Sequence, residues 1–426
     1  MPRTLPSAIL AAHTADSAKE GDICSVRVDF AFANDITAPP AMRAFREMGA
    51  RKVFDPDRCA ILPDHFTPNK DIAAAQQAKE ARDFAREMGM LYWEVGRVGV
   101  EHAFLPEQGL ILPGDIVVGA DSHTCSGGTL GAFATGMGST DLAAAWALGE
   151  TWFLVPPTIR VDFEGTRAPW ITGKDFILAL LGRIGVQGAR YAALEFGGTA
   201  VKDLPLDDRF TVANMAVEGG AKAGIFVPDE AVLAYAKARG RRSFEAIYPD
   251  EDASYAQRIE IDVAALEPLV AAPSSPGNMR RAAELSKTRV DQVFLGSCTN
   301  GRLRDMELAA KLLKGRRVAD SVRCIVIPAS YEVFAECMKR GYLDIFIEAG
   351  AAVSTPTCGP CLGGHMGILA AGERCLATSN RNFVGRMGHP QSEVYLAGPL
   401  VAAATAVTGH ITDPRELVSG DFWKGL

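Results

Sequence analysis

The sequence predicts an α/β protein with more than one domain. Short apolar runs that suit β-strands alternate with longer runs that suit α-helices. At 426 residues the chain is too long for one core, so we expect two or three domains. Its 48% hydrophobic and 22% charged residues are typical of a soluble globular protein.

Three short apolar runs are predicted strands, at residues 116–120, 292–296 and 324–328. The segment between the last two, residues 302–314, is rich in Leu, Met, Glu, Ala and Lys, which favour helix. Strand, turn, helix and strand form a βαβ unit, whose ligands bind beyond the carboxyl ends of the strands. Cys298 occupies that position after one strand, and Asp121 and His123 occupy it after another.

A further helix is predicted over residues 71–88, because Pro68 precedes it and Gly89 follows it. His65 therefore lies in a loop just ahead of a helix. The clearest linker is residues 271–278, which hold two prolines, two serines and a glycine, and a weaker break lies at residues 155–157. These breaks predict three segments, 1–155, 156–278 and 279–426.

Charge and hydropathy argue against two classes of partner. The net charge is −7, and basic residues adjoin only in pairs such as Arg241-Arg242, so we expect no nucleic-acid surface. The most apolar stretch, residues 394–407, is interrupted by Gly398 and Pro399 and is shorter than the ~20 residues that span a bilayer. No signal-peptide pattern opens the sequence, and nine cysteines then indicate reduced thiols or metal ligands in the cytoplasm.

Three of the cysteines have a spacing that indicates chemistry. Cys358 and Cys361 form a Cys-x-x-Cys pair among glycines, and Cys298 lies on its own strand-end turn. A structural zinc site or an ordinary iron–sulfur cluster takes four ligands. Three thiolates suit a [4Fe–4S] cluster with one iron open to substrate. A redox dithiol and unrelated buried cysteines remain alternatives.

Three of the seven histidines have an acidic residue close in sequence. His65 follows Asp64, His102 follows Glu101, and His123 lies two residues after Asp121. A carboxylate beside an imidazole raises its basicity and fixes its tautomer, as acid–base catalysis requires. The alternative for each is a surface or core histidine with ordinary hydrogen bonds.

Residues 380–386 place Arg381 and Arg386 five positions apart, with Asn380 and Asn382 as neutral donors. A guanidinium group binds a carboxylate through two parallel hydrogen bonds. The alternative is a solvated loop with scattered charges. A Lewis-acidic iron, imidazoles and carboxylate-binding arginines would together suit a polycarboxylic hydroxy acid.

The chain resembles the aconitase superfamily over nearly its whole length. Within that superfamily it is most similar to the cluster-bearing subunits of isopropylmalate isomerases, in their shorter, archaeal-type form. The resemblance rests on several blocks in the same order: Asn34-Asp-Ile-Thr37, Pro63-Asp-His65, Pro106-Glu-Gln-Gly109, Leu112-Pro-Gly114, Gly119-Ala-Asp-Ser-His-Thr124, Gly296-Ser-Cys-Thr-Asn300, Cys358-Gly-Pro-Cys361 and Asn380-Arg-Asn-Phe-Val-Gly-Arg386. It implies three α/β/α domains around an iron–sulfur cluster, without the final swivelling domain of single-chain aconitases.

The resemblance also implies a role for each matching residue. Asp64 and His65 would help the substrate hydroxyl leave as water, while His102, Asp121 and His123 would hydrogen-bond that water. Glu195 matches an active-site glutamate, and Asn214 and Glu218 lie in a similar block. The implied cluster ligands are Cys298, Cys358 and Cys361, and the implied substrate-binding residues are Asn380, Arg381 and Arg386.

The implied reaction is dehydration of a 2-hydroxy acid followed by rehydration on the neighbouring carbon. A separate small subunit would supply a serine base and further arginines. Isomerisation of isopropylmalate in leucine biosynthesis is the leading expectation. Dehydratases of dimethylmalate, hydratases of maleate or citraconate, and homoaconitases are alternatives, as is a cluster-sensing, RNA-binding regulator.

Overall fold

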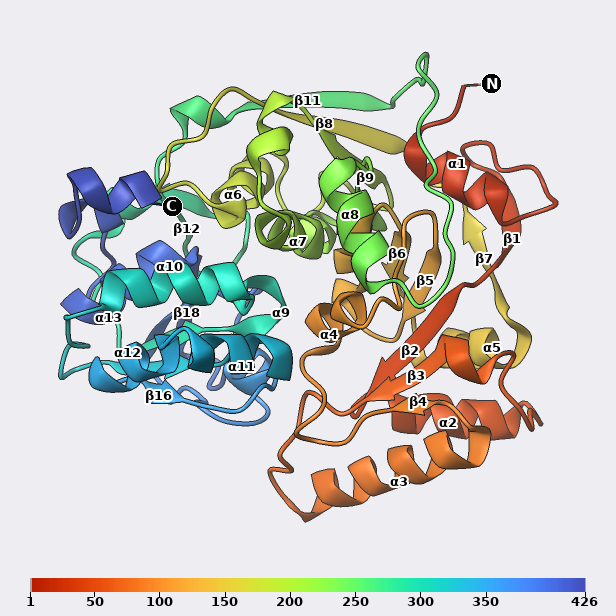
Figure 1. Cartoon of the computed structure of the whole chain (residues 1–426), viewed down its shortest axis with the longest axis horizontal. Helices are drawn as coiled ribbons and strands as arrows, with labels where there is room; N and C mark the ends of the chain where they lie inside the picture. The colour runs from red at the N-terminus through yellow and green to blue at the C-terminus, as the bar shows by residue number, and fades with distance from the viewer. Residues whose placement is uncertain (1, 426) are drawn as a thin grey trace. The chain divides into compact units, whose positions relative to one another are not determined.

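The computed structural model describes residues 2–425 and has the expected α/β architecture (Figure 1). Four sheets are present in this part of the chain. The first large sheet has the order β4-β3-β2-β5-β6, and all its strands are parallel. Its strands are β2 (Phe30–Asn34), β3 (Cys59–Leu62), β4 (Leu91–Tyr92), β5 (Ile116–Gly119) and β6 (Phe133–Gly136).

The second large sheet has the order β10-β9-β8-β11, with β8, β9 and β10 parallel. Its strands are β8 (Thr158–Glu164), β9 (Ala193–Gly197), β10 (Ala223–Phe226) and β11 (Gln257–Asp262). A separate antiparallel ribbon pairs β1 (Ile23–Arg27) with β7 (Glu150–Leu154).

The third large sheet has the order β13-β12-β18-β17-β14-β15-β16. The five strands from β18 to β16 are parallel, and β12 is antiparallel to both of its neighbours. The strands are β12 (Leu269–Ala271), β13 (Met279–Arg281), β14 (Gln292–Leu295), β15 (Arg323–Val326), β16 (Ala352–Val353), β17 (Arg374–Ala377) and β18 (Glu393–Ala397).

Helices connect most of the strands, as parallel pairing requires. They are α1 (Leu5–Ala12), α2 (Ala38–Glu47), α3 (Ile72–Met88), α4 (Glu101–Glu107), α5 (Ser139–Leu148), α6 (Gly173–Ile184), α7 (Leu206–Asn214), α8 (Glu230–Arg239), α9 (Ser297–Asn300), α10 (Leu303–Leu313), α11 (Tyr331–Lys339), α12 (Tyr342–Glu348) and α13 (Pro399–Thr408). The 3₁₀ segments η2 (Ser122–Leu130) and η7 (Gly359–Leu362) carry site residues.

Two local predictions are confirmed. The Asp71 carboxylate caps α3 by accepting from the Ala74 amide at 2.7 Å, and Gly89 ends the helix at a φ of 70°, which glycine adopts readily. Strands β14 and β15 pair in parallel with α10 between them in the chain, which is the expected βαβ unit. These elements follow local sequence rules closely, which explains their predictability.

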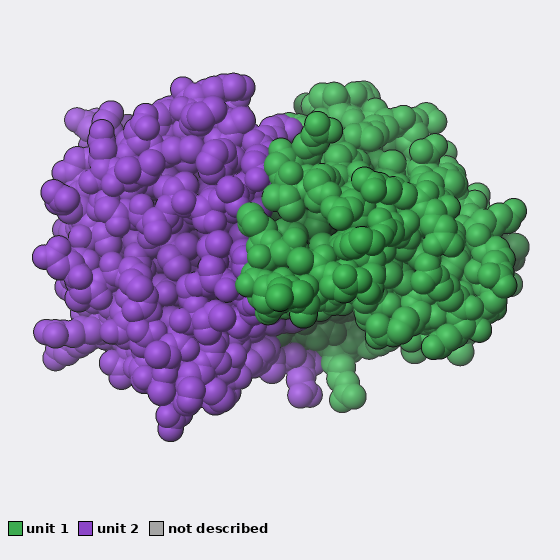
Figure 2. Space-filling model, turned by 90° about the horizontal axis from the view of Figure 1, so that it is seen from below, with its two compact units in different colours: residues 1–162, 189–198, 213–260 green, residues 163–188, 199–212, 261–426 purple. Residues whose placement is uncertain are grey.

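The chain packs into two compact units (Figure 2). Unit 1 contains residues 1–162, 189–198 and 213–260, and unit 2 contains residues 163–188, 199–212 and 261–426. The division at residues 155 and 278 into three segments stays a prediction. The stretch interpreted as a linker joins β12 to β13 as a hairpin, in which the Ala272 amide donates to the Asn278 carbonyl at 2.8 Å.

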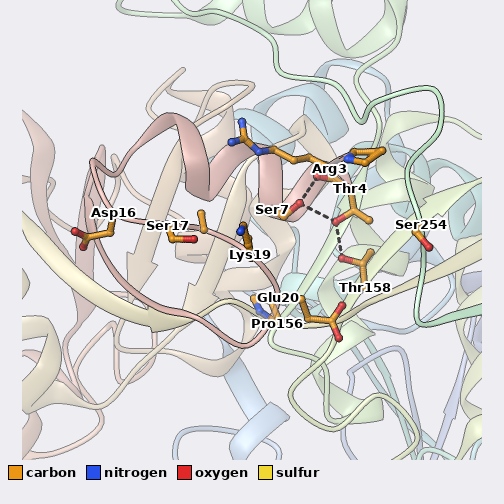
Figure 3. A pocket seen from close by; sticks show the side chains of 12 residues that line it. Arg3, Thr4, Ser7, Asp16, Ser17, Lys19, Glu20, Pro156, Thr158 and Ser254 are labelled. Carbon is orange, nitrogen blue, oxygen red and sulfur yellow. Dashed lines mark hydrogen bonds between the residues drawn. The ribbon is translucent and has the colours of Figure 1, made fainter.

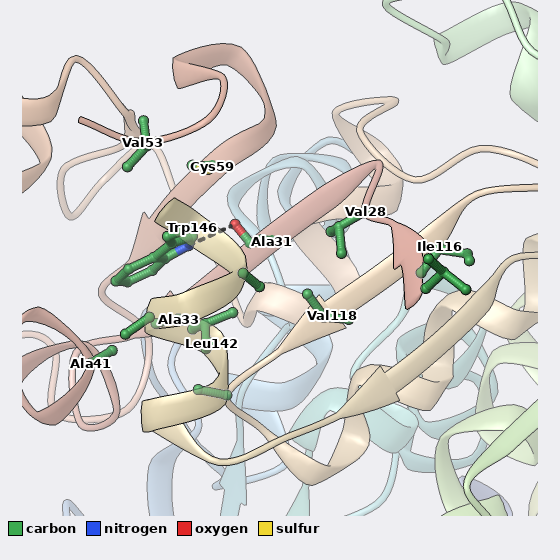
Figure 4. Packing of buried hydrophobic residues seen from close by; sticks show 14 of the residues in the cluster. Val28, Ala31, Ala33, Ala41, Val53, Cys59, Ile116, Val118, Leu142 and Trp146 are labelled. Atoms are coloured by element: carbon green, nitrogen blue, oxygen red, sulfur yellow. Dashed lines mark hydrogen bonds between the residues drawn. The ribbon is translucent and has the colours of Figure 1, made fainter. Parts of the chain in front are cut away.

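Each unit has its own apolar core. In unit 1 the buried Trp146 of α5 packs against the first sheet, and its indole N–H donates to the Ala31 carbonyl at 3.3 Å (Figure 4). In unit 2, α10 and α13 bury apolar side chains such as Leu308 and Val401 against the third sheet. No helix within residues 2–425 is long and apolar enough to cross a membrane.

Candidate functional site

The predicted acid–base residues of unit 1 lie at one edge of the first sheet. Because β2, β3 and β5 are parallel neighbours, their carboxyl ends bring together Asp35, the Asp64-His65 pair and Asp121. The Asp35 carboxylate accepts the backbone amides of Asp64, His65 and Phe66 at 3.0, 2.9 and 2.8 Å. It thereby fixes the loop that presents His65.

Each of the three histidines has a different carboxylate partner at hydrogen-bond distance. The joined atoms are His65 Nδ1 and Asp64 Oδ1 at 2.5 Å, His102 Nε2 and Asp121 Oδ1 at 2.9 Å, and His123 Nε2 and Glu218 Oε1 at 2.7 Å. The pairs also approach one another, since His65 Nε2 lies 3.9 Å from Asp121 Oδ2. The structure therefore brings five predicted catalytic residues into one cluster, with Glu218 as a sixth member.

The charges of this cluster are interdependent. Burial would raise the pKa of Asp121, but the charges and hydrogen bonds of His102 and His123 hold it well below its ordinary range. Burial would lower the pKa of His65, but the Asp64 carboxylate raises it well above its ordinary range. His65 is thus suited to hold a proton at neutral pH and to donate it as a general acid.

Glu195 lies elsewhere in unit 1, and its described contacts include none of the predicted site residues. Its fully buried carboxylate accepts from Arg160 Nη1 at 2.8 Å, from the Tyr255 hydroxyl at 2.7 Å and from the Leu5 amide at 2.9 Å. These contacts make it an anchor for strand β8 and helix α1, and its catalytic role stays a prediction. Asn214 is also buried, and its side-chain amide donates to the Ser126 hydroxyl in η2 at 2.8 Å.

Two of the cavities in unit 1 differ in their relation to the acid–base cluster. One of about 320 Å³ is lined by Asp121, Ser122, Thr135 and Lys222 among others, so one carboxylate of the cluster opens into it. The other, of about 290 Å³, lies beside α1 and contains none of the predicted residues (Figure 3). Its lining includes two basic and two acidic side chains, so its charge gives it no preference for an anion or a cation.

In unit 2, Cys298 lies at the carboxyl end of β14, as predicted. Gly296 just before it has a φ of 158°, and a Cβ atom there would stand 2.8 Å from the Ile327 carbonyl oxygen. Ser297 has a φ of 77°, in the left-handed region that non-glycine residues rarely adopt. This backbone turns the chain abruptly and presents Cys298 at the strand end.

The Cys298 and Cys361 thiols share two neighbours. Asn380 Nδ2 donates to Cys298 Sγ at 3.3 Å, and Cys361 Sγ donates to Asn380 Oδ1 at 3.9 Å. The Ser297 hydroxyl lies 3.8 Å from Cys298 Sγ and 3.6 Å from Cys361 Sγ. Cys358 is the N-cap of η7, the segment that contains Cys361, and all three cysteines are at least 94% buried. The tertiary fold therefore gives Cys298 and Cys361, which are 63 residues apart in sequence, two neighbours in common.

Arg386 also approaches the cysteines, and its Nη2 is directed at Cys361 Sγ at 3.9 Å. Asn382 instead holds the loop, because its side-chain amide donates to the Ala272 carbonyl at 2.9 Å. Arg381 is half-buried beside them. The binding of substrate carboxylates by Asn380, Arg381 and Arg386 stays a prediction.

The same unit contains a fully buried lysine that the sequence did not predict as a site residue. Lys174, in the first turn of α6, donates to the Thr378 carbonyl at 3.0 Å and to the Ser379 carbonyl at 2.7 Å. Burial lowers its pKa to about 7, while the negative charges of Asp305, Cys298 and Cys361 oppose that shift. Lysine side chains are rarely fully buried unless they are paired. No pattern in the sequence indicates that a lysine at the start of this helix is buried.

Sequence reasoning also assigned no role of their own to Asp35 and Glu101. Asp35 lies in one of the matching blocks, and Glu101 was considered only as the neighbour of His102. The position of Asp35 directly after a strand could have identified it by the same argument that identified Asp121. The burial of Glu101 among other acids depends on three separate segments, which no local pattern reveals.

Comparison with known proteins gives consistent results. The model of the Aconitase family (aconitate hydratase) matches residues 7–287 and 278–409. The chain is 57% identical over 420 residues to the 3-isopropylmalate dehydratase large subunit of Moorella thermoacetica, covering 98% of this chain and 100% of that protein. It is 58% identical to the protein of the same name from Syntrophus aciditrophicus, with the same coverage.

Among solved structures, aconitase X of Thermococcus kodakaraensis in its holo form has a similar fold. The TM-score is 0.50 at 16% sequence identity, and the match covers 84% of each chain. At that identity the likeness concerns the fold alone, and it agrees with the α/β architecture described above.

Proposed function

Because the chain belongs to the aconitase family, we propose that it is the large, cluster-bearing subunit of 3-isopropylmalate dehydratase. It would interconvert 2-isopropylmalate and 3-isopropylmalate by dehydration and rehydration in leucine biosynthesis. The observation that carries this proposal is identity above 50% over 98% of the chain with large subunits of that name. The two clusters of site residues supply the chemistry that the reaction needs.

The residues of unit 2 fit a [4Fe–4S] cluster that has three cysteine ligands and one iron open to substrate. Cys298, Cys358 and Cys361 would hold it, and the Asn380 amide would donate to a ligand sulfur, as its contact with Cys298 suggests. Donors that share one zinc ion stand about 3.8 Å apart, given a Zn–S bond of about 2.3 Å. Within residues 2–425, no cysteine belongs to a group of three metal-ligating donors within 4.8 Å of one another. The three thiols therefore do not lie close enough together in this structure to share a single zinc ion.

When bound, an open iron acts as a Lewis acid that polarises a carboxylate and weakens the bond to a hydroxyl group. The chain itself would then move and hold protons. His65, kept protonated by Asp64, would give its proton to the departing hydroxyl. His102 and His123, oriented by Asp121 and Glu218, would hold the resulting water for its return to the neighbouring carbon.

The proposal includes a small subunit, because the relatives are named large subunits. That partner would supply the base that removes the proton from carbon and further groups that bind the substrate carboxylates. We also propose a cytoplasmic location. Within the described residues none of the nine cysteines forms a disulfide, which fits a reducing compartment.

The test is anaerobic co-expression with a candidate small subunit, followed by assay of the purified pair. Isopropylmalate should be turned over faster than dimethylmalate, maleate, citraconate or homoaconitate. Iron and sulfide should be present at about four each per chain, as a [4Fe–4S] cluster requires. Faster turnover of another acid in this panel would contradict the proposed substrate, and stoichiometric zinc would contradict the cluster.

A further inference from the structure

The acid–base cluster of unit 1 contains one carboxyl group more than its pairs explain. Asp64, Asp121 and Glu218 each have a histidine, and Asp35 is bound by three backbone amides. The fifth carboxyl group, Glu101, has neither arrangement. It is fully buried at the first position of α4.

The contacts of Glu101 leave half of its carboxyl group unsatisfied. Oε1 accepts from Asn34 Nδ2 at 3.1 Å and lies 3.5 Å from His102 Nε2, which is closer to Asp121, at 2.9 Å. Oε2 is buried without a hydrogen-bond partner among residues 2–425. An ionised carboxylate needs several donors, and leaving one oxygen bare in a dry interior is costly.

The charged groups around Glu101 also disfavour its ionisation. The Asp64 carboxylate faces it from the loop after β3, because Asp64 Oδ2 accepts the Glu101 backbone amide at 2.8 Å. The Asp121 carboxylate faces it from the end of β5, while Asp35 lies behind Asp64. The imidazoles of His65 and His102 are already engaged by Asp64 and Asp121. Burial, followed by the charges on Asp64 and Asp121, raises the pKa of Glu101 well above its ordinary value.

We propose that Glu101 is a neutral carboxylic acid that sets the charge of the adjoining His102-Asp121 and Asp64-His65 pairs. As a neutral group it leaves Asp121 as the anionic partner of His102. It also adds no negative charge to those of Asp64 and Asp121 beside His65. Ionised, Glu101 would compete for His102 Nε2 and strengthen the hold of His65 on its proton. It is a positioning residue, since it acts through the charges of the neighbouring carboxylate–histidine pairs.

The first experiment uses the chain alone and needs neither cluster nor substrate. The infrared spectrum of the parent at about pH 8 should contain the carbonyl band of a protonated carboxylic acid. That band should shift when the glutamates are isotopically labelled, and it should disappear in Glu101→Gln. The absence of a glutamate-dependent band in the parent would overturn the proposal, and this measurement on the parent does not depend on the folding of any variant.

The second experiment follows the stability of the chain against pH. A pKa raised by folding means that the folded state takes up a proton, so stability is lost as pH rises through the range between the unfolded and folded values. The difference in unfolding free energy between E101Q and the parent should therefore move in favour of E101Q from about pH 5 to about pH 8. Asp121→Asn is the matched control. Because the pKa of Asp121 is lowered in the folded state, the unfolding free energy of the parent should increase relative to that of D121N as the pH rises from acid values. A pH-independent difference for E101Q would overturn the proposal.

The third experiment uses the assembled enzyme, and only this one rests on the proposed function. The alkaline limb of the activity profile should move at least one pH unit higher in E101Q. A loss of turnover as deep as that of Glu218→Gln, with the limb unmoved, would mean that Glu101 acts as an anion and would overturn the proposal. If the infrared and stability results hold while isopropylmalate is not turned over, the proposed function fails and the neutral Glu101 stands.

Discussion

The two clusters of site residues use the same position in a sheet but differ in how their charges are balanced. Both lie at the carboxyl ends of parallel strands, after β3 and β5 in unit 1 and after β14 in unit 2. In unit 1 each imidazole already has a carboxylate, so the protein alone balances its charges. In unit 2 an amide, a guanidinium and a hydroxyl are directed at sulfur, and a buried ammonium lies nearby.

The difference indicates which of the two clusters depends on an added group. The acid–base residues are positioned by hydrogen bonds that form as unit 1 folds. The cysteines are surrounded by groups that favour negative charge on sulfur, as binding to iron provides. Substitutions in unit 1 should therefore change proton transfer and leave metal content unchanged, whereas substitutions in unit 2 should change metal content first.

The largest expected effect is that of Cys361→Ser in unit 2. Loss of one of the three proposed ligands should remove the cluster and lower turnover by about 10³-fold or more, since Lewis-acid stabilisation is worth several kcal/mol. Iron and sulfide analysis with electron paramagnetic resonance would measure the loss. Cys337→Ala, at a buried cysteine of α11 in the core of unit 2, is the control and should keep its cluster. Full iron content in C361S would exclude Cys361 as a ligand.

The matching change in unit 1 is His65→Asn. Turnover should fall by about 10²- to 10⁴-fold, the range for loss of a general acid, while iron and sulfide stay at the parent level. Asp64→Asn should lower turnover less, because it removes the group that holds the proton on His65 and leaves the imidazole in place. Loss of iron from either variant would remove the proposed distinction between the two units.

Lys174→Met tests the buried cation of unit 2. A charge interaction across the protein interior is on the order of 1–2 kcal/mol, so the cluster should lose iron about tenfold faster under air. Lys174→Arg, which keeps the charge, should lie between the variant and the parent. The rate would be followed by the electron paramagnetic resonance signal of the oxidised cluster. Equal rates for K174M and the parent would show that the ammonium serves only to hold residues 378 and 379.

The last effect, on stability alone, concerns Asp305, whose pKa is raised to about 7 chiefly by burial. A raised pKa means that its contribution to stability is complete below the ordinary aspartate value and is lost as pH rises through the folded value. Asp305→Asn should therefore gain stability on the parent between about pH 4 and about pH 7, by at most about 4 kcal/mol, since one pKa unit is worth about 1.4 kcal/mol. Chemical denaturation of the chain without metal would measure it. If the parent instead became more stable than D305N as the pH rises, Asp305 would be stabilised as an anion.

The sequence predicted the features that depend on local rules. Helix α3 has its aspartate cap and its terminal glycine, and the β14–α10–β15 unit follows from alternating strand and helix patterns. The stretch at residues 271–278, interpreted as a linker, forms the loop between β12 and β13, and composition could not reveal this because hairpin loops and domain linkers are both rich in proline, serine and glycine. The catalytic role predicted for Glu195 rested on resemblance, whereas its described contacts are a buried network with Arg160 and Tyr255.

By itself the sequence determined the α/β class, the cysteine spacing and the histidines beside acidic residues. Those features depend on hydrophobic periodicity and on neighbours in the chain, which can be read directly. Only the tertiary structure decided which carboxylate each histidine contacts, that Asn380 lies beside two cysteines, and that Lys174 and Glu101 are fully buried. The reason is physical: burial and pairing shift the energy of a charge by several kcal/mol, and both depend on segments that meet only in the folded chain.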